Sequence, residues 1–213
     1  MPILYEDRVV LAVDKPPGWM LAPDEWTHTG RNLPRTLQIA IQLREYWERS
    51  RNVKFLRYVH RLDAETTGIL LLAKSPGAVA ALSNLFETRA VEKKYLCVLS
   101  GVPKSGQWTA SGEVKNKSAE TRFQVLQSVN NRSLVLAFPL TGRTHQIRVH
   151  ARDSGHAILG DTIYGSHDEG GLALRAVFLR YTCPFQRRPI RIRAPFDAFV
   201  SDWKFDPNLP IPL

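Results

Sequence analysis

The chain has 213 residues, of which 44% are hydrophobic, and Lys and Arg outnumber Asp and Glu by 29 to 20, for a net charge of +9. This length suffices for one domain with a substantial core, and no apolar run approaches the roughly 20 residues that span a bilayer. Cys97 and Cys183 have no CxxC partner and lie in apolar contexts, so we expect buried free thiols in a reducing cytoplasm.

The first half of the chain predicts alternating strands and helices around a long loop. The turn-rich segment DKPPGWMLAPDEWTHTGRNLP is of a length that is usually functional or disordered. Thr36 is expected to cap a helix, and Ser75 with Pro76 is typical of a helix start. The segment from Ile69 to Ala73 is apolar without interruption, which predicts a strand buried on both faces. We expect strands over residues 9–13, 57–61 and 68–74, and helices over 37–49 and from 76 onwards.

The second half of the chain changes its hydrophobic period toward two, which predicts mainly strands. A helix is expected over 144–153, closed by Gly155, and a short one around 199–203. We expect strands over residues 95–99, 121–126, 133–138, 177–182 and 190–194, the last two as a hairpin. Because no repeat or composition shift marks a boundary, we predict a single α+β domain over 1–213 with a largely antiparallel sheet.

Arginines gather in two segments of the chain. One holds Arg143, Arg148 and Arg152, and the other is a later group consisting of Arg187, Arg188, Arg191 and Arg193. This clustering, with the net charge, favours a polyanionic partner, most often nucleic acid. The sequence shows no basic amphipathic helix of the kind that binds a membrane surface.

The stretch YVHRLDAETTGILLLAK, residues 58–74, joins a charged turn directly to the buried strand. Asp63 beside Arg61 has two interpretations. It is either a turn residue that bonds its own backbone or a reactive carboxylate held next to a cation. Glycosidases normally use two carboxylates, and only Glu65 lies near.

The segment PLTGRTHQIRVHARDSGHAILGD, residues 139–161, places a glycine-bearing turn before a helix, which suits a phosphate. His145, His150 and His156 do not share one helical face, so hydrogen-bonding roles are favoured over a metal site. Tyr95 in EKKYLCVLSG is either packed or catalytic. No GxSxG or GxxxxGK[ST] motif is present.

Together these segments resemble the RluA family of RNA pseudouridine synthases. HRLDAETTGILLLAK is similar to that family's HRLDxxTSGLLLxAK, with Thr67 where serine is usual, and KKYLCVLSG is similar to KxYxAxVxG. PLTGRTHQIRVHARDSGHAILGD resembles the third motif and LAVDKPPGW the opening one. The resemblance runs from about residue 5 to residue 195.

The resemblance implies a pseudouridine synthase fold, with a mixed, mainly antiparallel sheet flanked by helices and loops and a central active cleft. Asp63 would be the catalytic aspartate, and Tyr95 would stack on the target base and assist proton removal from its C5. Arg148 would form an ion pair with the aspartate. Arg61 would fill the space left by the flipped uridine. The remaining RNA contacts implied are His60, Arg143 and His145.

The implied partner is structured RNA, either tRNA or rRNA, with no cofactor, no metal and no membrane, and the protein is expected to be a cytoplasmic monomer. KPPGW resembles the KPAGW of the TruC branch, which favours tRNA, although the Val-His that often follows is missing. No S4-type module is expected, so recognition would come from the domain and its loops.

Isomerising uridine breaks the N1–C1′ bond and joins C5 to C1′ while the uracil stays bound, so one carboxylate can suffice where a glycosidase uses two. Asp63 could attack C1′ or remove a proton from C2′, and the sequence leaves both open. Two other functions also stay open, namely an RNA-binding protein without catalysis and a metal-dependent nuclease that uses the histidines.

Overall fold

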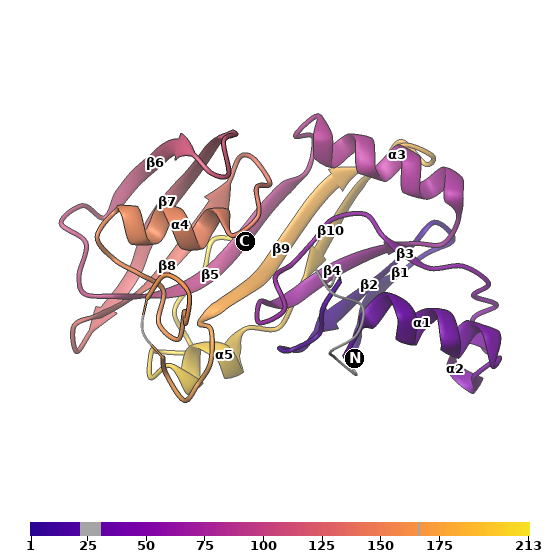
Figure 1. Cartoon of the computed structure of the whole chain (residues 1–213), viewed down its shortest axis with the longest axis horizontal. Coiled ribbons are helices and arrows are strands. Elements are labelled where there is room, and N and C mark those ends of the chain that lie inside the picture. The colour runs from indigo at the N-terminus through magenta and orange to yellow at the C-terminus, as the bar shows by residue number, and fades with distance from the viewer. Residues whose placement is uncertain (22–30, 166) are drawn as a thin grey trace. The chain divides into compact units, whose positions relative to one another are not determined.

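The computed structural model describes residues 1–21, 31–165 and 167–213, and the chain folds into two compact units (Figure 1). The first unit comprises Met1–Ala90 with Tyr181–Ile192, and the second comprises Val91–Arg180 with Arg193–Leu213. The prediction of one domain over the whole chain stays a prediction. Residues 22–30 of the predicted long loop, which include Trp26, lie outside the described residues.

The first unit is built on antiparallel strands. Strand β2 pairs with both β1 and β4, and β3 pairs with the far end of β4. Five successive residues of β4, from Ile69 to Ala73, are at most 1% exposed, as the uninterrupted apolar run predicted. The elements of this unit are β1 (Ile3–Glu6), β2 (Val10–Lys15), α1 (Leu33–Gln42), α2 (Tyr46–Arg49), β3 (Arg57–Tyr58), β4 (Thr67–Ala73) and α3 (Pro76–Glu87).

Helix α1 corrects one prediction. Its cap is Asn32, whose side-chain oxygen accepts the N–H of Arg35 at 3.0 Å, whereas Thr36 donates its hydroxyl to the Asn32 carbonyl. An amide oxygen at this position satisfies a helical N–H that lacks a partner within the helix. The single helix expected over 37–49 is also wrong, because the chain turns at Arg44 (φ 54°) before α2 begins. Helix α3, by contrast, is capped by Ser75 as predicted.

The second unit contains a sheet in the order β9-β5-β8-β7-β6, in which the pairs β5–β8, β5–β9, β6–β7 and β7–β8 are antiparallel. Strand β6 was not predicted, because Trp108 and Ala110 are the only two apolar residues of QWTASGE and make a short alternation. The elements of the second unit are β5 (Glu92–Ser100), β6 (Gln107–Glu113), β7 (Ser118–Val129), β8 (Arg132–Pro139), α4 (Gln146–Asp153), β9 (Leu174–Thr182) and α5 (Asp197–Asp202).

Strands β9 and β10 (Pro189–Arg193) each pass from one unit into the other. In the first unit the N–H of Cys183 donates to the carbonyl of Arg188, and in the second the N–H of Ala194 donates to Val177. These hydrogen bonds confirm the predicted hairpin.

Apolar side chains of β5, β8 and β9 pack with those of α4 and α5 to form the core of the second unit. Cys97 lies in this core and Cys183 in the first unit, and both are buried free thiols, as predicted. The helices and the antiparallel pairings confirm the α+β prediction. Among the described residues, no helix is long and apolar enough to cross a membrane.

Candidate functional site

The Asp63 loop connects β3 to β4 in the first unit. Leu62 and Thr66 are 7% and 2% exposed and anchor the loop on either side of Asp63, which is itself half-buried. The N–H of Thr66 donates to the carbonyl of Asp63 at 3.2 Å, which closes a tight turn. The carboxylate is therefore carried by a short turn that leads straight into the most deeply buried strand of this unit.

Lys15 clamps this loop through its backbone. The ammonium is fully buried and donates to the carbonyls of Ala64 at 2.6 Å and Pro16 at 3.0 Å. The Ala64 carbonyl also accepts the N–H of Gly18 at 2.9 Å. Burial lowers the pKa of Lys15 to about 8, and the nearby charges of Glu65 and Asp63 oppose that shift. The KPPG segment is thus attached to the residue that follows Asp63.

His60 and Arg61 precede Asp63 in the same loop. The ring of His60 stacks on Phe86 of α3 with centroids 4.8 Å apart, and its Nε2 accepts the N–H of Leu71 at 3.0 Å. These contacts give His60 a role in fixing the loop on β4, whereas Arg61 is exposed. Contact of either residue with RNA stays a prediction.

Tyr95 lies on β5 in the second unit. Its neighbours on the adjacent strands are Ala137 of β8 and Ala176 of β9. Directly opposed residues in antiparallel strands point to the same face, so small side chains flank the Tyr95 ring, which is half-buried against the core. Two residues earlier, Lys93 donates to the carbonyl of Thr141 at 3.1 Å, and burial lowers its pKa to about 8.

A buried polar network holds the start of α4. Gln146 accepts from the hydroxyl of Thr141 at 2.6 Å and from the N–H of Arg143 at 3.0 Å. Its amide nitrogen donates to the Thr121 hydroxyl and the Glu120 carbonyl, both at 2.9 Å. All the hydrogen-bonding groups of this amide are therefore used, which fixes the register of α4 on β7.

Arg148, on α4, forms a buried ion pair with Asp161. Its Nε donates to one carboxylate oxygen at 2.8 Å and its Nη2 to the other at 2.7 Å, and the side chains are 6% and 0% exposed. Burial alone would raise the pKa of Asp161, but the hydrogen bonds from Arg148 and from the N–H groups of Tyr164 and Ile163 lower it. The guanidinium is thereby held in one orientation.

An aromatic ring extends this arrangement. The Tyr164 ring lies beneath the guanidinium groups of Arg148 and Arg152, at 5.4 and 5.2 Å from its centroid. The hydroxyl of Tyr164 is 3.1 Å from Nδ1 of His145, which has a left-handed backbone conformation and immediately precedes α4. The Arg143 Nε donates to the Ser118 carbonyl at 3.2 Å. The predicted residues Arg143, His145 and Arg148 thus gather around the start of one helix.

The other two histidines of this segment have separate hydrogen-bonding partners. Nδ1 of His150 lies 2.9 Å from the Thr121 hydroxyl, and burial lowers the pKa of His150. Nδ1 of His156 lies 2.9 Å from the Ser100 carbonyl.

Each unit therefore collects part of the predicted site. His60, Arg61 and Asp63 share one loop of the first unit, while Tyr95, Arg143, His145 and Arg148 belong to the second. The ion pair between Asp63 and Arg148 stays a prediction. Sequence reasoning missed the supporting residues Lys15, Gln146 and Asp161, although all three lie inside segments that carried the resemblance.

Comparisons with known proteins identify the family. A family model described as RNA pseudouridylate synthase matches residues 9–153. The ribosomal large subunit pseudouridine synthase C of Vibrio vulnificus is 34% identical over 91% of this chain and 65% of its own length. The protein of the same name from Escherichia coli K12 is 33% identical over 92% of this chain and 66% of its own length. The chain thus spans just under two thirds of these curated relatives.

Solved structures agree with this match. Human RNA Pseudouridylate Synthase Domain Containing 1 superposes with a TM-score of 0.71 at 27% identity, covering 93% of this chain and 84% of that one. Human RNA Pseudouridylate Synthase Domain Containing 4 gives a TM-score of 0.74 at 23% identity, over 93% and 91%, and so shares the fold. The resemblance and the predicted fold class are confirmed, and the chain belongs to the RluA-type family of RNA pseudouridylate synthases.

Proposed function

We propose that this protein is an RNA pseudouridine synthase that isomerises specific uridines in structured RNA. Asp63 supplies the catalytic carboxylate, and the target nucleotide is flipped out of its helix to reach it. The observation that carries the proposal is the Asp63 loop, which the buried Lys15 ammonium holds through the Ala64 carbonyl at 2.6 Å. A carboxylate on so constrained a turn can be kept at a defined distance from one sugar carbon, which is the condition for efficient attack.

Asp63 attacks C1′ of the target uridine or removes a proton from C2′ to give a glycal. In either route the N1–C1′ bond breaks, the freed uracil turns while still bound, and C5 joins C1′. In the first route this step breaks the ester between Asp63 and C1′, and in the second Asp63 returns the proton to C2′. Tyr95 stacks on the base and assists removal of the C5 proton. Its neighbours on the adjacent strands are Ala137 of β8 and Ala176 of β9, so no bulky side chain of either strand stands directly beside the ring.

Arg148 is proposed to form an ion pair with Asp63 and to orient its carboxylate. Its bidentate pair with Asp161 supports this role, because a guanidinium already fixed on one side can direct its remaining N–H groups. Asp161 acts on the reaction through Arg148 and is therefore a positioning residue.

Arg61 is proposed to occupy the space that the flipped uridine leaves, with Arg143, His145 and His60 contacting RNA nearby. Extruding a base costs a few kcal/mol, and least where the RNA is looped. Arg61 is exposed on the Asp63 loop, which suits insertion into a helix.

The proposed substrate is large-subunit rRNA, because the relatives at 33–34% identity are named as ribosomal large subunit synthases. The similarity of KPPGW to the TruC branch keeps tRNA as the second candidate. Both RNAs are structured polyanions and suit a protein with a net charge of +9.

The decisive experiment maps pseudouridine in total RNA from cells with and without the gene, by carbodiimide labelling and reverse-transcription stops. We expect discrete stops to vanish on deletion and to return with the wild-type gene but not with Asp63→Ala or Asp63→Asn. With purified protein, we expect either substitution to lower turnover by about 10³-fold or more.

Glu65→Gln is the matched control, since Glu65 is an exposed carboxylate two residues further along the same loop. We expect it to restore the stops. An Asp63→Asn variant that isomerises uridine at the wild-type rate would refute the proposed mechanism. Full activity in EDTA with a prefolded RNA would separate this mechanism from a metal-dependent nuclease.

A further inference from the structure

The second arginine cluster is not used by the proposed reaction. From Gly170 to Phe196 the sequence contains six arginines and no acidic residue. Three of these arginines lie in the first unit, within residues 183–191, which we name the arginine turn. They are Arg187, Arg188 and Arg191, and all three are exposed.

The arginine turn has a defined backbone. The N–H of Cys183 donates to the carbonyl of Arg188 at 2.9 Å, and the N–H of Arg187 donates back to the carbonyl of Cys183 at 2.8 Å. Ile190 and Ile192 are at most 4% exposed and alternate with exposed residues along β10. Burial of one set of side chains therefore directs Arg191 outward.

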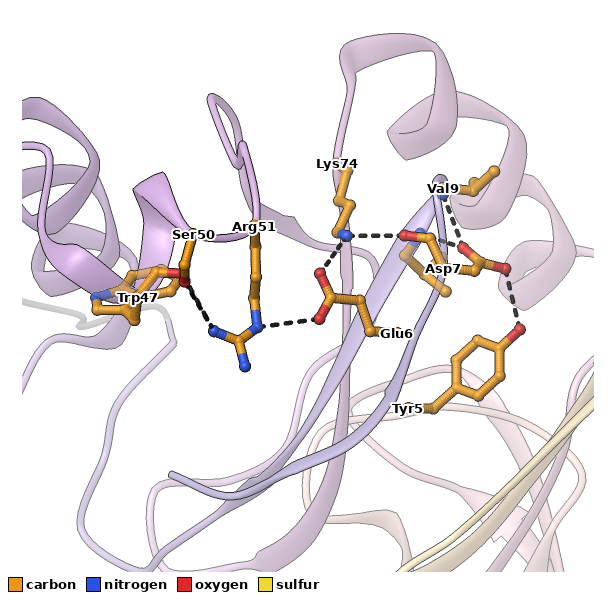
Figure 2. Close-up of polar contacts among 9 residues, drawn as sticks. Tyr5, Glu6, Asp7, Val9, Trp47, Ser50, Arg51 and Lys74 are labelled. Atoms are coloured by element: carbon orange, nitrogen blue, oxygen red, sulfur yellow. Dashed lines mark hydrogen bonds and ion pairs between the residues drawn. The ribbon is translucent and has the colours of Figure 1, made fainter.

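The charge of this turn is not neutralised as that of Arg51 and Lys74 is. Arg51 and Lys74 both pair with Glu6, at 3.1 and 2.6 Å (Figure 2). Within the described part of the chain, Arg187 and Arg191 have no such acidic partner.

Among the residues that the structure describes, the side-chain contact of Arg188 is a hydrogen bond to the hydroxyl of Tyr5 at 3.5 Å. That hydroxyl already donates to one oxygen of Asp7, whose other oxygen accepts the N–H groups of Val9 and Val10 (Figure 2). The Asp7 carboxylate is therefore used by the turn between β1 and β2, and the three guanidinium groups can bind an external anion.

We propose that the arginine turn is a second RNA-binding surface, which contacts the backbone of substrate RNA outside the target nucleotide. Guanidinium groups match phosphate oxygens in pairs, and arginine also stacks on bases. Phe185, in the same turn, is 53% exposed and offers an aromatic face to an unpaired base. The inference rests on the proposed RNA substrate.

The test compares two triple variants from the same unit. One is Arg187→Gln with Arg188→Gln and Arg191→Gln. The control removes equal charge from exposed arginines of α1, α2 and their connection, as Arg35→Gln with Arg44→Gln and Arg49→Gln. Binding of a labelled transcript of a large-subunit rRNA domain is measured by fluorescence anisotropy at several salt concentrations, after circular dichroism confirms equal folding.

We expect the arginine-turn variant to raise Kd by about tenfold or more at low salt and to reduce the slope of log K against log[salt] by about two to three, as loss of three phosphate contacts requires. The control should keep the wild-type slope. If both triple variants weaken RNA binding equally, the net charge of the protein and not the arginine turn sets the affinity, and the proposal is overturned. Wild-type affinity in the arginine-turn variant would also overturn it.

A variant with lysine in place of Arg187, Arg188 and Arg191 tests whether the geometry of the guanidinium group contributes to RNA affinity. We expect it to restore the salt slope while Kd stays several-fold above wild type, because an ammonium cannot bind phosphate bidentately. Vesicles of phosphatidylserine and phosphatidylcholine serve as the other anionic surface. Loss of vesicle binding with unchanged RNA binding would overturn the choice of RNA.

Turnover assays separate this proposal from the proposed reaction. On the long transcript the arginine-turn variant should raise KM and leave kcat unchanged, whereas on a short stem–loop both constants should match wild type. Loss of kcat on both RNAs would place the turn in the catalytic step and refute a flanking contact. If the wild-type protein forms no pseudouridine, the reaction fails, while the anisotropy measurements still decide the surface.

Discussion

The Asp63 loop and the Arg148 side chain are held in place in different ways. The loop is fixed through its backbone, since Lys15 and Gly18 both donate to the Ala64 carbonyl. Arg148 is fixed through its side chain, by two hydrogen bonds to the fully buried Asp161. The carboxylate is thus positioned through the backbone of its loop, whereas the guanidinium is positioned through hydrogen bonds of its own donor groups.

The buried pair offers the largest expected effect. Arg148→Met leaves Asp161 buried without its counter-ion, and we expect a loss of about 3–5 kcal/mol in the free energy of unfolding. The double variant with Asp161→Asn should recover much of that stability, because asparagine can still accept the N–H groups of Ile163 and Tyr164.

Urea unfolding of the two variants and the wild type provides the measurement. Activity should stay lost in both variants, since neither has the guanidinium proposed to orient Asp63. A single variant as stable as the wild type would contradict the importance of the pair.

The clamp on the Asp63 loop should have a smaller effect, and one that depends on pH. The pKa of Lys15 is lowered by burial to about 8. Between that value and its ordinary value of about 10.4 the unfolded chain binds a proton that the folded chain does not, so stability rises with pH there. Wild type should therefore gain stability relative to Lys15→Met from about pH 8 to about pH 10.

Unfolding curves at about pH 7 and about pH 9.5 test this sign. We also expect Lys15→Met to lower kcat by about tenfold, because a loosened loop misplaces the carboxylate. Wild type and variant curves that shift in parallel with pH would show that Lys15 is not the titrating group. Lys74→Met, which removes an ammonium that pairs with Glu6 instead of the Asp63 loop, is the control.

The surface cluster in Figure 2 should show the smallest effect. Glu6 joins Arg51 and Lys74, but its side chain is 26% exposed and that of Arg51 is 37% exposed. Exposed ion pairs are screened by water and salt, so we expect Glu6→Gln to cost less than about 1 kcal/mol. That cost should shrink further in concentrated salt. A loss comparable to that of Arg148→Met would remove the contrast between surface and buried pairs.

Several elements could be predicted because their causes are local. The apolar run of β4, the Ser75 cap of α3 and the Gly155 that ends α4 are each set by residues within a few positions. The resemblance placed Asp63, Tyr95 and Arg148 by motif alone. The cap of α1 was misassigned because Asn32 and Thr36 are both good capping residues, and only the backbone angles of α1 decide between them.

The amino-acid sequence by itself determined the fold class, the family and the reactive residues proposed here, because periodicity and long motifs are properties of neighbouring positions. Tertiary structure alone decided the supporting contacts. Lys15 meets Ala64 across 49 positions, and Arg148 meets Asp161 across 13. A buried charge must find a partner wherever the packed chain brings one, and that requirement leaves no local pattern in the sequence.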